Sequence, residues 1–383
     1  MPKPDSPASA PVPVGWVSCV GEKGGAEVLM LNTARELACK GFPARMAQLR
    51  SGPLDAECEA LGIPVTVFPR HRMRNLPAVL WTVVRIARWA RRNRIGLLHG
   101  NGFRAHAYSG PASRLAGIPN VLTVHSPEPP GLFTRSILRI PCDGLVANCE
   151  TTADWFRAHG GSPRIAWPGV PVGTLSPGAP REELESRFGI APGRRWVSMV
   201  SRIQKHKGHV HFVRAVAAAA KAGQDVHGIV VGAPLFGLDE GLLPALKAEA
   251  ASLGVAGRMT FTGFVDDRTV AGFQAASTVG LHTAMTEDFG IAIAESMARG
   301  VPVVAFAASG PSHLIQPGTG WLAPIGDQAL LDAALCGALS DPDRLRAFGE
   351  AARLRVLANF TMERHAAVVG EIYHGLLAAR NRG

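Results

Sequence analysis

The feature that most constrains the fold is an alternation of short apolar runs with longer segments of helical periodicity, which occurs twice along the 383 residues. Helical patterns such as 25–39, 77–93 and 102–116 separate most of the runs. Strands that alternate with helices predict parallel, doubly wound sheets. We therefore predict an α/β protein with two Rossmann-like domains. The expected strands are 14–20, 43–49, 64–68, 95–99, 120–125, 144–148 and 164–168, followed by 195–201, 226–232, 258–263, 277–282 and 301–307.

A segment dense in Pro and Gly, "PGVPVGTLSPGAPREE" at 168–183, separates the two series and is predicted to be the linker. We place the domains at 14–178 and 179–361. Residues 1–13 are rich in Pro, Ala and Ser and lack the apolar core of a signal peptide, so a disordered tail is expected. Residues 362–383 carry a helical, amphipathic pattern. Ligands of such folds bind at the carboxyl ends of the strands, and we expect the site in the cleft between the domains.

Composition narrows the class of protein. The chain is 47% apolar and 18% charged, as in ordinary globular proteins, and its formal charge of +10 suits an anionic partner. Its six cysteines form no C-x-x-C pair, which fits a reduced cytosolic compartment and argues against structural zinc. No run approaches the roughly 18–20 apolar residues that span a bilayer. We expect a cytoplasmic protein that can contact a membrane without crossing it.

The first loop reads "GEKGGAEVLMLNTAREL" at 21–37, where a strand ends and a helix begins. Gly24 and Gly25 allow a close backbone approach, and free amides at a helix start favour phosphate. Neither G-x-G-x-x-G nor a Walker A motif is present, which disfavours a nicotinamide-dependent dehydrogenase. A simple strand-to-helix turn explains the same residues.

The first loop of the second series reads "SRIQKHKGH" at 201–209. Arg202 and Lys207 emerge where the strand ends, and two cations there could neutralise a diphosphate. An exposed basic turn is the alternative interpretation.

The stretch "TEDFGIAIAESMARG" at 286–300 places two carboxylates in an apolar run. Glu287 falls on a loop, and Glu295 falls inside a helix that Gly300 and Pro302 end. Glu295 lies among apolar residues, and a buried carboxylate is rare without a partner, which favours ligand binding over a solvated face. Free amides at the helix start would point at phosphate or sugar oxygens; they belong to Phe289, Gly290 and Ile291.

Four segments in this order, "GGAE", "SRIQKHKG", "FTGFV" and E-x₇-E before "MARGVPVVA", resemble the retaining glycosyltransferases of family 4 with the GT-B fold. The resemblance spans about residues 14 to 380. It implies that Arg202 and Lys207 contact the diphosphate of a nucleotide-sugar donor. It also implies that Glu287 contacts the donor sugar and that Glu295 binds the ribose hydroxyls.

The same resemblance assigns further contacts. Phe264 and Val265 of "FTGFV" would border the base through their backbone, and the Gly24–Gly25 loop would close over the phosphates. His125 of "LTVHS" matches the family's histidine near the transferred sugar. Residues 362–380 resemble the helix that crosses back to the first domain.

The chain departs from the family pattern at two places. Pro168-Gly169-Val170 stands where Asn-Gly-Val is common, and His313 of "SGPSH" stands where an acid is usual. The second departure bears on donor identity or on full activity. Other histidines form no acid-paired motif and are interpreted as core or surface residues: His99, His106, His206, His209, His211 and His227.

No metal or other cofactor is expected. Metal-using glycosyltransferases generally carry Asp-x-Asp after a strand, whereas the only match here, Asp341-Pro342-Asp343, lies between two helical patterns where a helix-start turn explains it. Arg202, Lys207 and helix N-termini would then stabilise the charge of the leaving group.

A basic surface lies outside the family motifs. From Arg70 to Ser126 there are ten arginines and no Asp or Glu. Exposed Trp beside Arg suits an anionic membrane surface or acceptor, although a solvated basic face explains the same charges. In helix 77–93 we expect a side facing the sheet, formed by Leu80, Val83, Ile86, Ala87 and Ala90. We expect an exposed side formed by Trp81, Arg85, Arg88, Trp89 and Arg92.

The sequence therefore predicts a retaining glycosyltransferase that moves a hexose or N-acetylhexosamine from a UDP- or GDP-sugar to a hydroxyl acceptor. Cell-envelope glycan or glycosylated-metabolite synthesis is the expected setting. A GT-B sugar-nucleotide epimerase and a non-catalytic sugar-nucleotide-binding subunit remain alternatives. The basic face carries no recognisable nucleic-acid module, so no nucleic-acid partner is expected.

Overall fold

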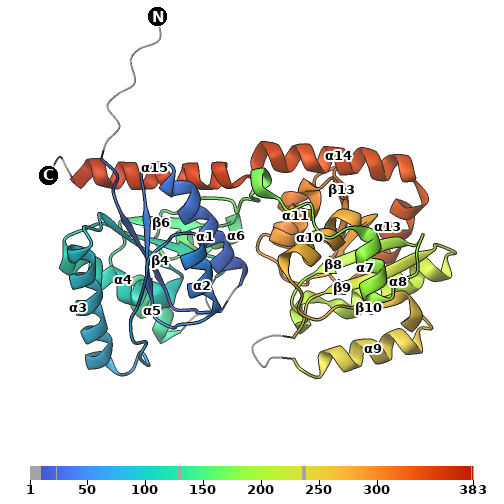
Figure 1. Ribbon diagram of the computed structural model, residues 1–383, viewed down its shortest axis with the longest axis horizontal. Helices are drawn as coiled ribbons and strands as arrows, with labels where there is room; N and C mark the ends of the chain where they lie inside the picture. The colour runs from blue at the N-terminus through green and yellow to red at the C-terminus, as the bar shows by residue number, and fades with distance from the viewer. Residues whose placement is uncertain (1–9, 23, 128–130, 235–238, 381, 383) are drawn as a thin grey trace, which may run out of the picture. The chain divides into compact units, whose positions relative to one another are not determined.

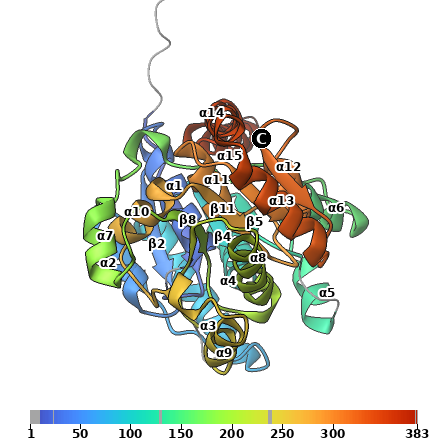
Figure 2. The same ribbon diagram turned by 90° about the vertical axis from the view of Figure 1, so that its right-hand side faces the viewer.

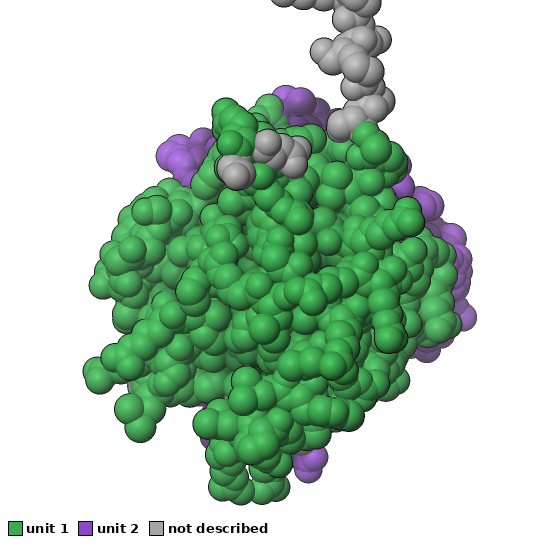
Figure 3. Space-filling model, turned by 90° about the vertical axis from the view of Figure 1, so that its left-hand side faces the viewer, with its two compact units in different colours: residues 1–169, 362–383 green, residues 170–361 purple. Residues whose placement is uncertain are grey.

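The structure is a computed structural model, and it describes residues 10–22, 24–127, 131–234, 239–380 and 382. Its contacts divide the chain into two compact units (Figures 1 and 3). Unit 1 comprises Met1–Gly169 and Met362–Gly383, and unit 2 comprises Val170–Thr361.

The described residues of unit 1 form a seven-stranded parallel sheet in the order β3-β2-β1-β4-β5-β6-β7. The order reverses between β1 and β4, which marks the point where Rossmann-like sheets open a crevice at their carboxyl edge. The strands are β1 (Val14–Ser18), β2 (Ala44–Gln48), β3 (Val65–Val67), β4 (Leu97–Asn101), β5 (Asn120–Val124), β6 (Gly144–Ala147) and β7 (Arg164–Ile165). The helices are α1 (Gly25–Ala38), α2 (Pro53–Ala60), α3 (Leu76–Arg92), α4 (Phe103–Ala116), α5 (Leu132–Leu138), α6 (Glu150–Ala158) and α15 (Met362–Arg380).

Helices cover both faces of this sheet because successive strand residues point to opposite sides. Val17 of β1 joins a core with α3 and α4, whereas Trp16 joins a core with α1, α2 and α15. The C-terminal helix α15 is thus part of the unit 1 core, where Tyr373 is fully buried.

Unit 2 repeats the plan with a six-stranded parallel sheet in the order β10-β9-β8-β11-β12-β13, and the order reverses between β8 and β11. Figure 2 shows α8 and α13 on one side of this sheet and α7, α10 and α11 on the other. The strands are β8 (Arg195–Val200), β9 (Val226–Val231), β10 (Met259–Phe261), β11 (Val279–His282), β12 (Val303–Phe306) and β13 (Gly320–Ala323). The helices are α7 (Arg181–Phe188), α8 (His209–Lys221), α9 (Leu242–Ser252), α10 (Asp267–Ala276), α11 (Ile291–Ala298), α12 (Ser309–Leu314), α13 (Gln328–Ser340) and α14 (Pro342–Asn359), with short 3-10 turns η1 (Val172–Thr174), η2 (Lys205–Lys207) and η3 (Ala256–Arg258).

The predicted fold class is confirmed: the chain is an α/β protein with two doubly wound parallel sheets. Every predicted strand is present, usually shorter than its apolar run. The sequence analysis missed β13, whose residues Gly-Trp-Leu-Ala follow a Gly-rich turn and carry no alternation over a useful length.

Unit 2 begins at Val170, earlier than the boundary predicted after residue 178. The amide of Val170 donates to Phe360 O at 2.8 Å, and that of Ala179 donates to Arg268 O at 3.0 Å. The Pro- and Gly-rich segment between these residues therefore packs with unit 2, because its backbone finds hydrogen-bond partners there.

The predicted faces of α3 need two corrections. Trp89 is 9% exposed, packs edge-to-face on Phe68 and donates through Nε1 to Thr66 Oγ1 at 3.1 Å, whereas Leu80 is 58% exposed. Val79 and Ile86 lie at the centre of the buried face of α3, and Trp89 and Leu80 lie at its two opposite edges. The Trp89 indole is buried because its N–H finds a hydrogen-bond partner there, whereas Leu80 points to solvent. Trp89 therefore belongs to the buried face and Leu80 to the exposed face, the reverse of the prediction.

Among the described residues, no helix combines the length and the apolar character needed to cross a membrane.

Candidate functional site

The strongest cluster of predicted site residues lies at the switch point of unit 2. Lys207 ends the turn η2 that follows β8, and Glu287 lies on the loop that follows β11. Lys207 Nζ is 2.7 Å from Glu287 Oε2, and the two side chains are only 13% and 17% exposed. The structure thus brings together a cation and a carboxylate that are 80 residues apart.

Hydrogen bonds tie the two loops that carry this pair. Thr283 Oγ1 donates to Gly208 O at 2.9 Å, and the amide of Met285 donates to His206 O at 2.8 Å. Gly208 has a φ of +67°, and a Cβ there would lie 2.1 Å from Thr283 O. Glycine is required on both grounds, because an L side chain would be strained and would push the loops apart.

Helix α12 fixes the other side of Glu287. The amide of Gly310, in α12, donates to Glu287 O at 2.8 Å, and a Cβ on Gly310 would lie 2.3 Å from Phe289 O. Phe289 is buried against Phe360, with ring centroids 5.7 Å apart. The backbone of the Glu287 loop is therefore held on two sides.

Helix α11 starts as the sequence predicted. Gly290 is its N-cap with a φ of +93°, and the helix begins at Ile291. The amides of Ile293 and Ala294 donate to Gly290 O at 3.0 and 3.1 Å. The amides at the very start of a helix, here those of Ile291 and Ala292, have no carbonyl of a preceding turn to bind and can donate to an anion. This helix start and the turn that carries Lys207 both lie at the carboxyl edge of the same sheet.

Glu295 lies within α11 and is half-buried. Burial raises the pKa of its carboxyl group, although Gln274 and Arg299 act in the opposite direction. Gln274 Nε2 donates to Glu295 Oε2 at 3.0 Å, and no described residue donates to Oε1. One carboxylate oxygen is thus held in place while the other can accept hydrogen bonds from a ligand.

Two opposing effects set the pKa of the Glu287 carboxyl group. Burial raises this pKa, but Lys207 and His282 together lower it by more, so the net pKa lies below the usual range. Asp288 shows the reverse, because burial and the neighbouring Glu287 raise its pKa. The site therefore combines the ionised Glu287 carboxylate, the Lys207 cation and the Asp288 carboxyl group, which ionises less readily than Glu287.

The remaining predicted residues of unit 2 lie on the same edge of the sheet. Arg202 follows β8 and is exposed, and Val265 is half-buried in the segment after β10. Phe264 is 76% exposed, and Gly263 before it has a φ of +69° that turns the chain. The loops after β8, β10 and β11 thus hold the predicted cations, the base-bordering segment and the carboxylates.

Unit 1 holds the other predicted residues at the carboxyl edge of its own sheet. His125 follows β5, its Nε2 donates to Asn101 Oδ1 at 2.7 Å, and its carbonyl accepts from Asn148 Nδ2 at 2.6 Å. Burial, with a smaller effect of His365, lowers the pKa of His125 to about 4, so the ring is neutral at pH 7. Gly24 is the N-cap of α1, and Gly25 is its first residue.

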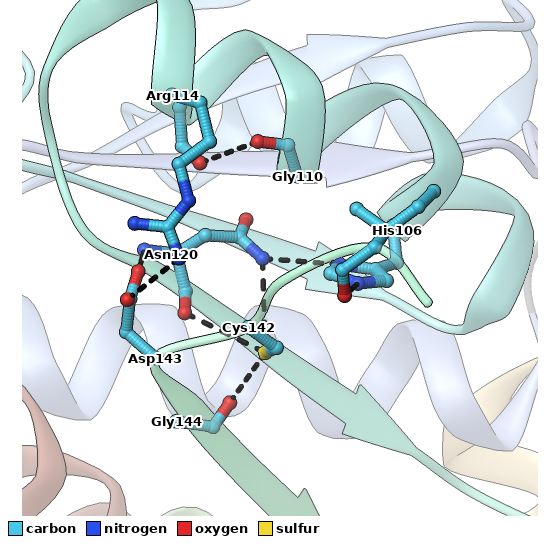
Figure 4. Close-up of polar contacts among 9 residues, drawn as sticks. His106, Gly110, Arg114, Asn120, Cys142, Asp143 and Gly144 are labelled. Atoms are coloured by element: carbon cyan, nitrogen blue, oxygen red, sulfur yellow. Dashed lines mark hydrogen bonds and ion pairs between the residues drawn. The ribbon is translucent and has the colours of Figure 1, made fainter. Parts of the chain in front are cut away.

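His106 illustrates the histidines that were assigned to the core. Figure 4 shows its ring beside Asn120 and Cys142; Asn120 Nδ2 donates to His106 Nδ1 at 3.0 Å, and His106 Nε2 contacts Ile140 O at 3.3 Å. Burial lowers the pKa of His106 to about 4. A cavity of about 300 Å³ adjoins His106 and Cys142, and the start of α4 and the segments that precede β6 and β7 contribute to its lining.

The structure also shows the surroundings of Asp341, predicted to begin a helix, and of His313, which stands where the family usually has an acid. Asp341 is the N-cap of α14 and accepts from the amide of Arg344 at 2.9 Å, which confirms the helix-start turn. His313 lies in α12 with its ring 5.7 Å from that of Phe360, and its carbonyl accepts from Arg355 Nη2. It packs beside the segment that supports Phe289.

Several residues of the site had no role in the sequence analysis: Gln274, His282, Thr283, Asp288 and Asn101. Asp288 could have been noticed, since it directly follows Glu287. Gln274 and Asn101 gave no signal, because each reaches its partner from a different element.

Comparison with known proteins identifies the class. The model of glycosyl transferases group 1 matches residues 180–355, and that of Glycosyltransferase Family 4 matches residues 23–173. A lipopolysaccharide core biosynthesis mannosyltransferase, LpcC of Rhizobium leguminosarum bv. viciae, is 30% identical over 246 residues, which cover 64% of this chain and 68% of the relative. The chain therefore belongs to glycosyltransferase family 4 and has the GT-B fold.

More distant relatives cover most of the chain. A D-inositol 3-phosphate glycosyltransferase of Gordonia bronchialis is 28% identical over 372 residues, which cover 87% of this chain and 80% of the relative. The crystal structure of Anabaena Alr3699/HepE in complex with UDP and glucose has a TM-score of 0.82 at 24% identity, covering 95% of this chain and 100% of that one. The chain is similar to these proteins along nearly its full length.

Proposed function

We propose that the protein is a retaining, metal-independent glycosyltransferase that moves a hexose or N-acetylhexosamine from a nucleotide-diphosphate sugar to a hydroxyl acceptor. The observation that carries the proposal is the half-buried Lys207–Glu287 pair, 2.7 Å apart at the switch point of unit 2. A cation for the diphosphate beside a carboxylate for the sugar is the charge pattern that an anionic nucleotide sugar requires.

In unit 2, Arg202 and Lys207 contact the donor diphosphate together with the amides of Phe289, Gly290 and Ile291. Glu287 contacts the donor sugar. Glu295 binds the ribose hydroxyls through the carboxylate that Gln274 orients at 3.0 Å. Phe264 and Val265 border the base through their backbone.

In unit 1, we assign a contact with the donor phosphates to Gly24 and Gly25 and a contact with the transferred sugar to His125. Neutral His125 donates through Nε2 to Asn101 at 2.7 Å, so Nδ1 is the ring atom without the proton and can accept from a sugar hydroxyl. Transfer occurs on the same face of the sugar, with the leaving phosphate assisting.

Lys207, Arg202 and the first-turn amides of α11 supply the positive charge for the leaving group. No three His, Cys, Asp or Glu side chains in the described part of the chain gather as metal ligands do. Transfer is expected to continue in excess EDTA; loss of turnover that Mg²⁺ or Mn²⁺ restores would overturn metal independence.

The donor is proposed to be a UDP- or GDP-sugar. Support comes from Anabaena Alr3699/HepE, which has the same fold and whose structure is described in complex with UDP-glucose, and from a mannosyltransferase among the relatives. The names of these relatives also support a role in envelope-glycan or glycosylated-metabolite synthesis. Thermal shift with uridine, guanosine and adenosine diphosphates would identify the base, because a bound ligand raises the unfolding temperature.

Transfer itself is tested with nucleotide sugars of the base that stabilises the protein in this screen, together with a panel of hydroxyl acceptors. Product with the anomeric configuration of the donor sugar is expected. An inverted product, or binding of nucleotides without any transfer or hydrolysis, would contradict the proposal.

We also propose that unit 1 binds the inner face of the cytoplasmic membrane through the exposed side of α3. Leu76, Leu80 and Trp81 are 62%, 58% and 53% exposed, and the Arg85 guanidinium lies 4.6 Å from the centre of the Trp81 ring. Arg88 and Arg92 are exposed on the same helix. Apolar side chains beside arginines match an anionic lipid surface, where the former insert and the latter contact headgroups.

Co-sedimentation with phosphatidylcholine vesicles, with and without phosphatidylglycerol, tests the membrane proposal. Binding to the anionic vesicles is expected, with loss in the triple variant Arg85→Glu, Arg88→Glu, Arg92→Glu. A variant with the same charge change on other surfaces, at Arg157, Arg346 and Arg353, is the control and should still bind. Equal binding by both triple variants would overturn the surface assignment.

A further inference from the structure

His282 is the last residue of β11, and its side chain is 6% exposed beside the Lys207–Glu287 pair. Its Nε2 lies 3.8 Å from Glu287 Oε2. Burial lowers the pKa of His282 to about 4; Glu287 raises this pKa and Lys207 lowers it, both by less than burial does. The imidazole is therefore neutral at pH 7. His209 also lies near this ring.

The proton of the neutral ring belongs on Nε2. A carboxylate can only accept hydrogen bonds, and Nε2 is the ring nitrogen near Glu287 Oε2. Nδ1 is buried without a hydrogen-bond partner among the described residues, so no contact draws the proton there. The separation of 3.8 Å exceeds a hydrogen bond by about 1 Å, which a small side-chain movement can close.

Lys207 Nζ donates to Glu287 Oε2 at 2.7 Å. A donor diphosphate attracts the Lys207 ammonium and weakens its hold on a carboxylate that is only 17% exposed. A largely desolvated carboxylate that loses its partner is unfavourable, and a second donor beside it would offset that cost.

We infer that His282 is a positioning residue for Glu287, and that its Nε2–H takes over Glu287 Oε2 when the donor diphosphate engages Lys207. The imidazole then keeps the carboxylate directed at the donor sugar. This inference rests on the proposed function, because it assumes that a nucleotide-diphosphate sugar occupies the site.

Three substitutions separate this role from a structural one. Glutamine can place an amide N–H where His282 Nε2 lies, whereas asparagine reaches only the position of Nδ1 and leucine offers no donor. We expect His282→Leu and His282→Asn to lower kcat/KM for the donor about tenfold, the effect of one hydrogen bond to a charged group. His282→Gln should restore most of the loss, and the affinity for the nucleoside diphosphate should fall in the leucine and asparagine variants and return with glutamine, because the diphosphate already draws Lys207 from Glu287.

Wild-type turnover in all three variants would overturn the inference. So would an unchanged affinity for the nucleoside diphosphate in His282→Leu, or rescue by asparagine rather than glutamine. A double-mutant cycle adds a second test: His282→Leu should cost little once Glu287→Gln is present, and additive losses would show that the residues act independently.

A measurement without ligand separates failure of this inference from failure of the proposed function. The imidazole of His282 is titrated by NMR in the full-length protein. Its pKa should rise in Lys207→Met and fall in Glu287→Gln, because Lys207 lowers that pKa and Glu287 raises it. An unchanged titration in both variants would overturn the contact, whereas a wild-type protein that binds no nucleotide would overturn the proposed function itself.

Discussion

The two units have the same sheet plan but use their carboxyl edges differently. In unit 2, backbone hydrogen bonds such as Met285 to His206 and Gly310 to Glu287 hold a half-buried ion pair in place. In unit 1, the corresponding edge carries glycines and the neutral His125, and charge gathers on the surface of α3. One unit thus presents an ion pair held by backbone hydrogen bonds, and the other presents a neutral histidine and a basic exterior.

The largest expected effect tests whether the charge of unit 2 drives transfer. Lys207→Ala should lower kcat about 10²–10³-fold, because one preorganised donor to the leaving group is lost. Lys205→Ala is the control, since its side chain is 84% exposed on the same turn. Steady-state kinetics with the donor is the measurement. An equal loss of activity in the two variants would contradict the role of Lys207 at the leaving group.

The next effect tests the rigidity of the unit 2 loops. Gly208→Ala should lower the free energy of unfolding by about 3 kcal/mol, since a Cβ would lie 2.1 Å from Thr283 O in addition to the left-handed backbone strain. Gly254 has a similar φ of +72° but open space around it, so Gly254→Ala should cost only about 1 kcal/mol. Urea denaturation measures both, and equal losses would show that the loops separate easily.

A smaller effect concerns the ribose contact. Glu295→Gln should weaken donor binding about tenfold by replacing a charged acceptor with a neutral one, while leaving kcat nearly unchanged. The surface variant Glu350→Gln, at a side chain 58% exposed, should bind as wild type. Calorimetry with the nucleoside diphosphate is the measurement, and unchanged affinity in Glu295→Gln would remove this residue from the site.

The last prediction addresses a property that both units share, and its effect is absent at pH 7. His106 in unit 1 and His209 in unit 2 are each 1% exposed, and burial lowers their pKa to about 4. A group with a depressed basic pKa contributes stability that is complete above about pH 6.5 and is lost as pH falls toward 4, because the unfolded chain binds more protons. His106→Leu should therefore flatten the fall of unfolding free energy in this window by about 1.4 kcal/mol per pH unit. His374→Leu, on an exposed position, is the control, and equal slopes for both variants would contradict the interpretation.

Much of the fold could be predicted because it follows from local patterns. The alternation of apolar runs predicts both parallel sheets, and Gly290 and Gly300 mark the ends of α11. The edges of α3 could not be predicted in the same way. The periodicity of α3 predicts an apolar face but not which residues lie at its edges. The hydrogen-bond partner of Trp89 is Thr66, which lies on β3, a separate element.

The candidate site shows the same division. Lys207, Glu287 and Glu295 could be named from motif and residue type, and the fold places all three at the carboxyl edge of unit 2. The start of unit 2 at Val170 was set by hydrogen bonds to Phe360, which composition does not reveal.

The sequence by itself determined the class of fold, the order of the site segments and the chemistry of their side chains, because these depend on local periodicity and residue type. Only the tertiary structure decided the neighbours: Gln274 beside Glu295, His282 beside Glu287 and Thr283 against Gly208. Each of these contacts joins separate elements, and their distances depend on how strands and helices pack. No pattern within one segment specifies that packing.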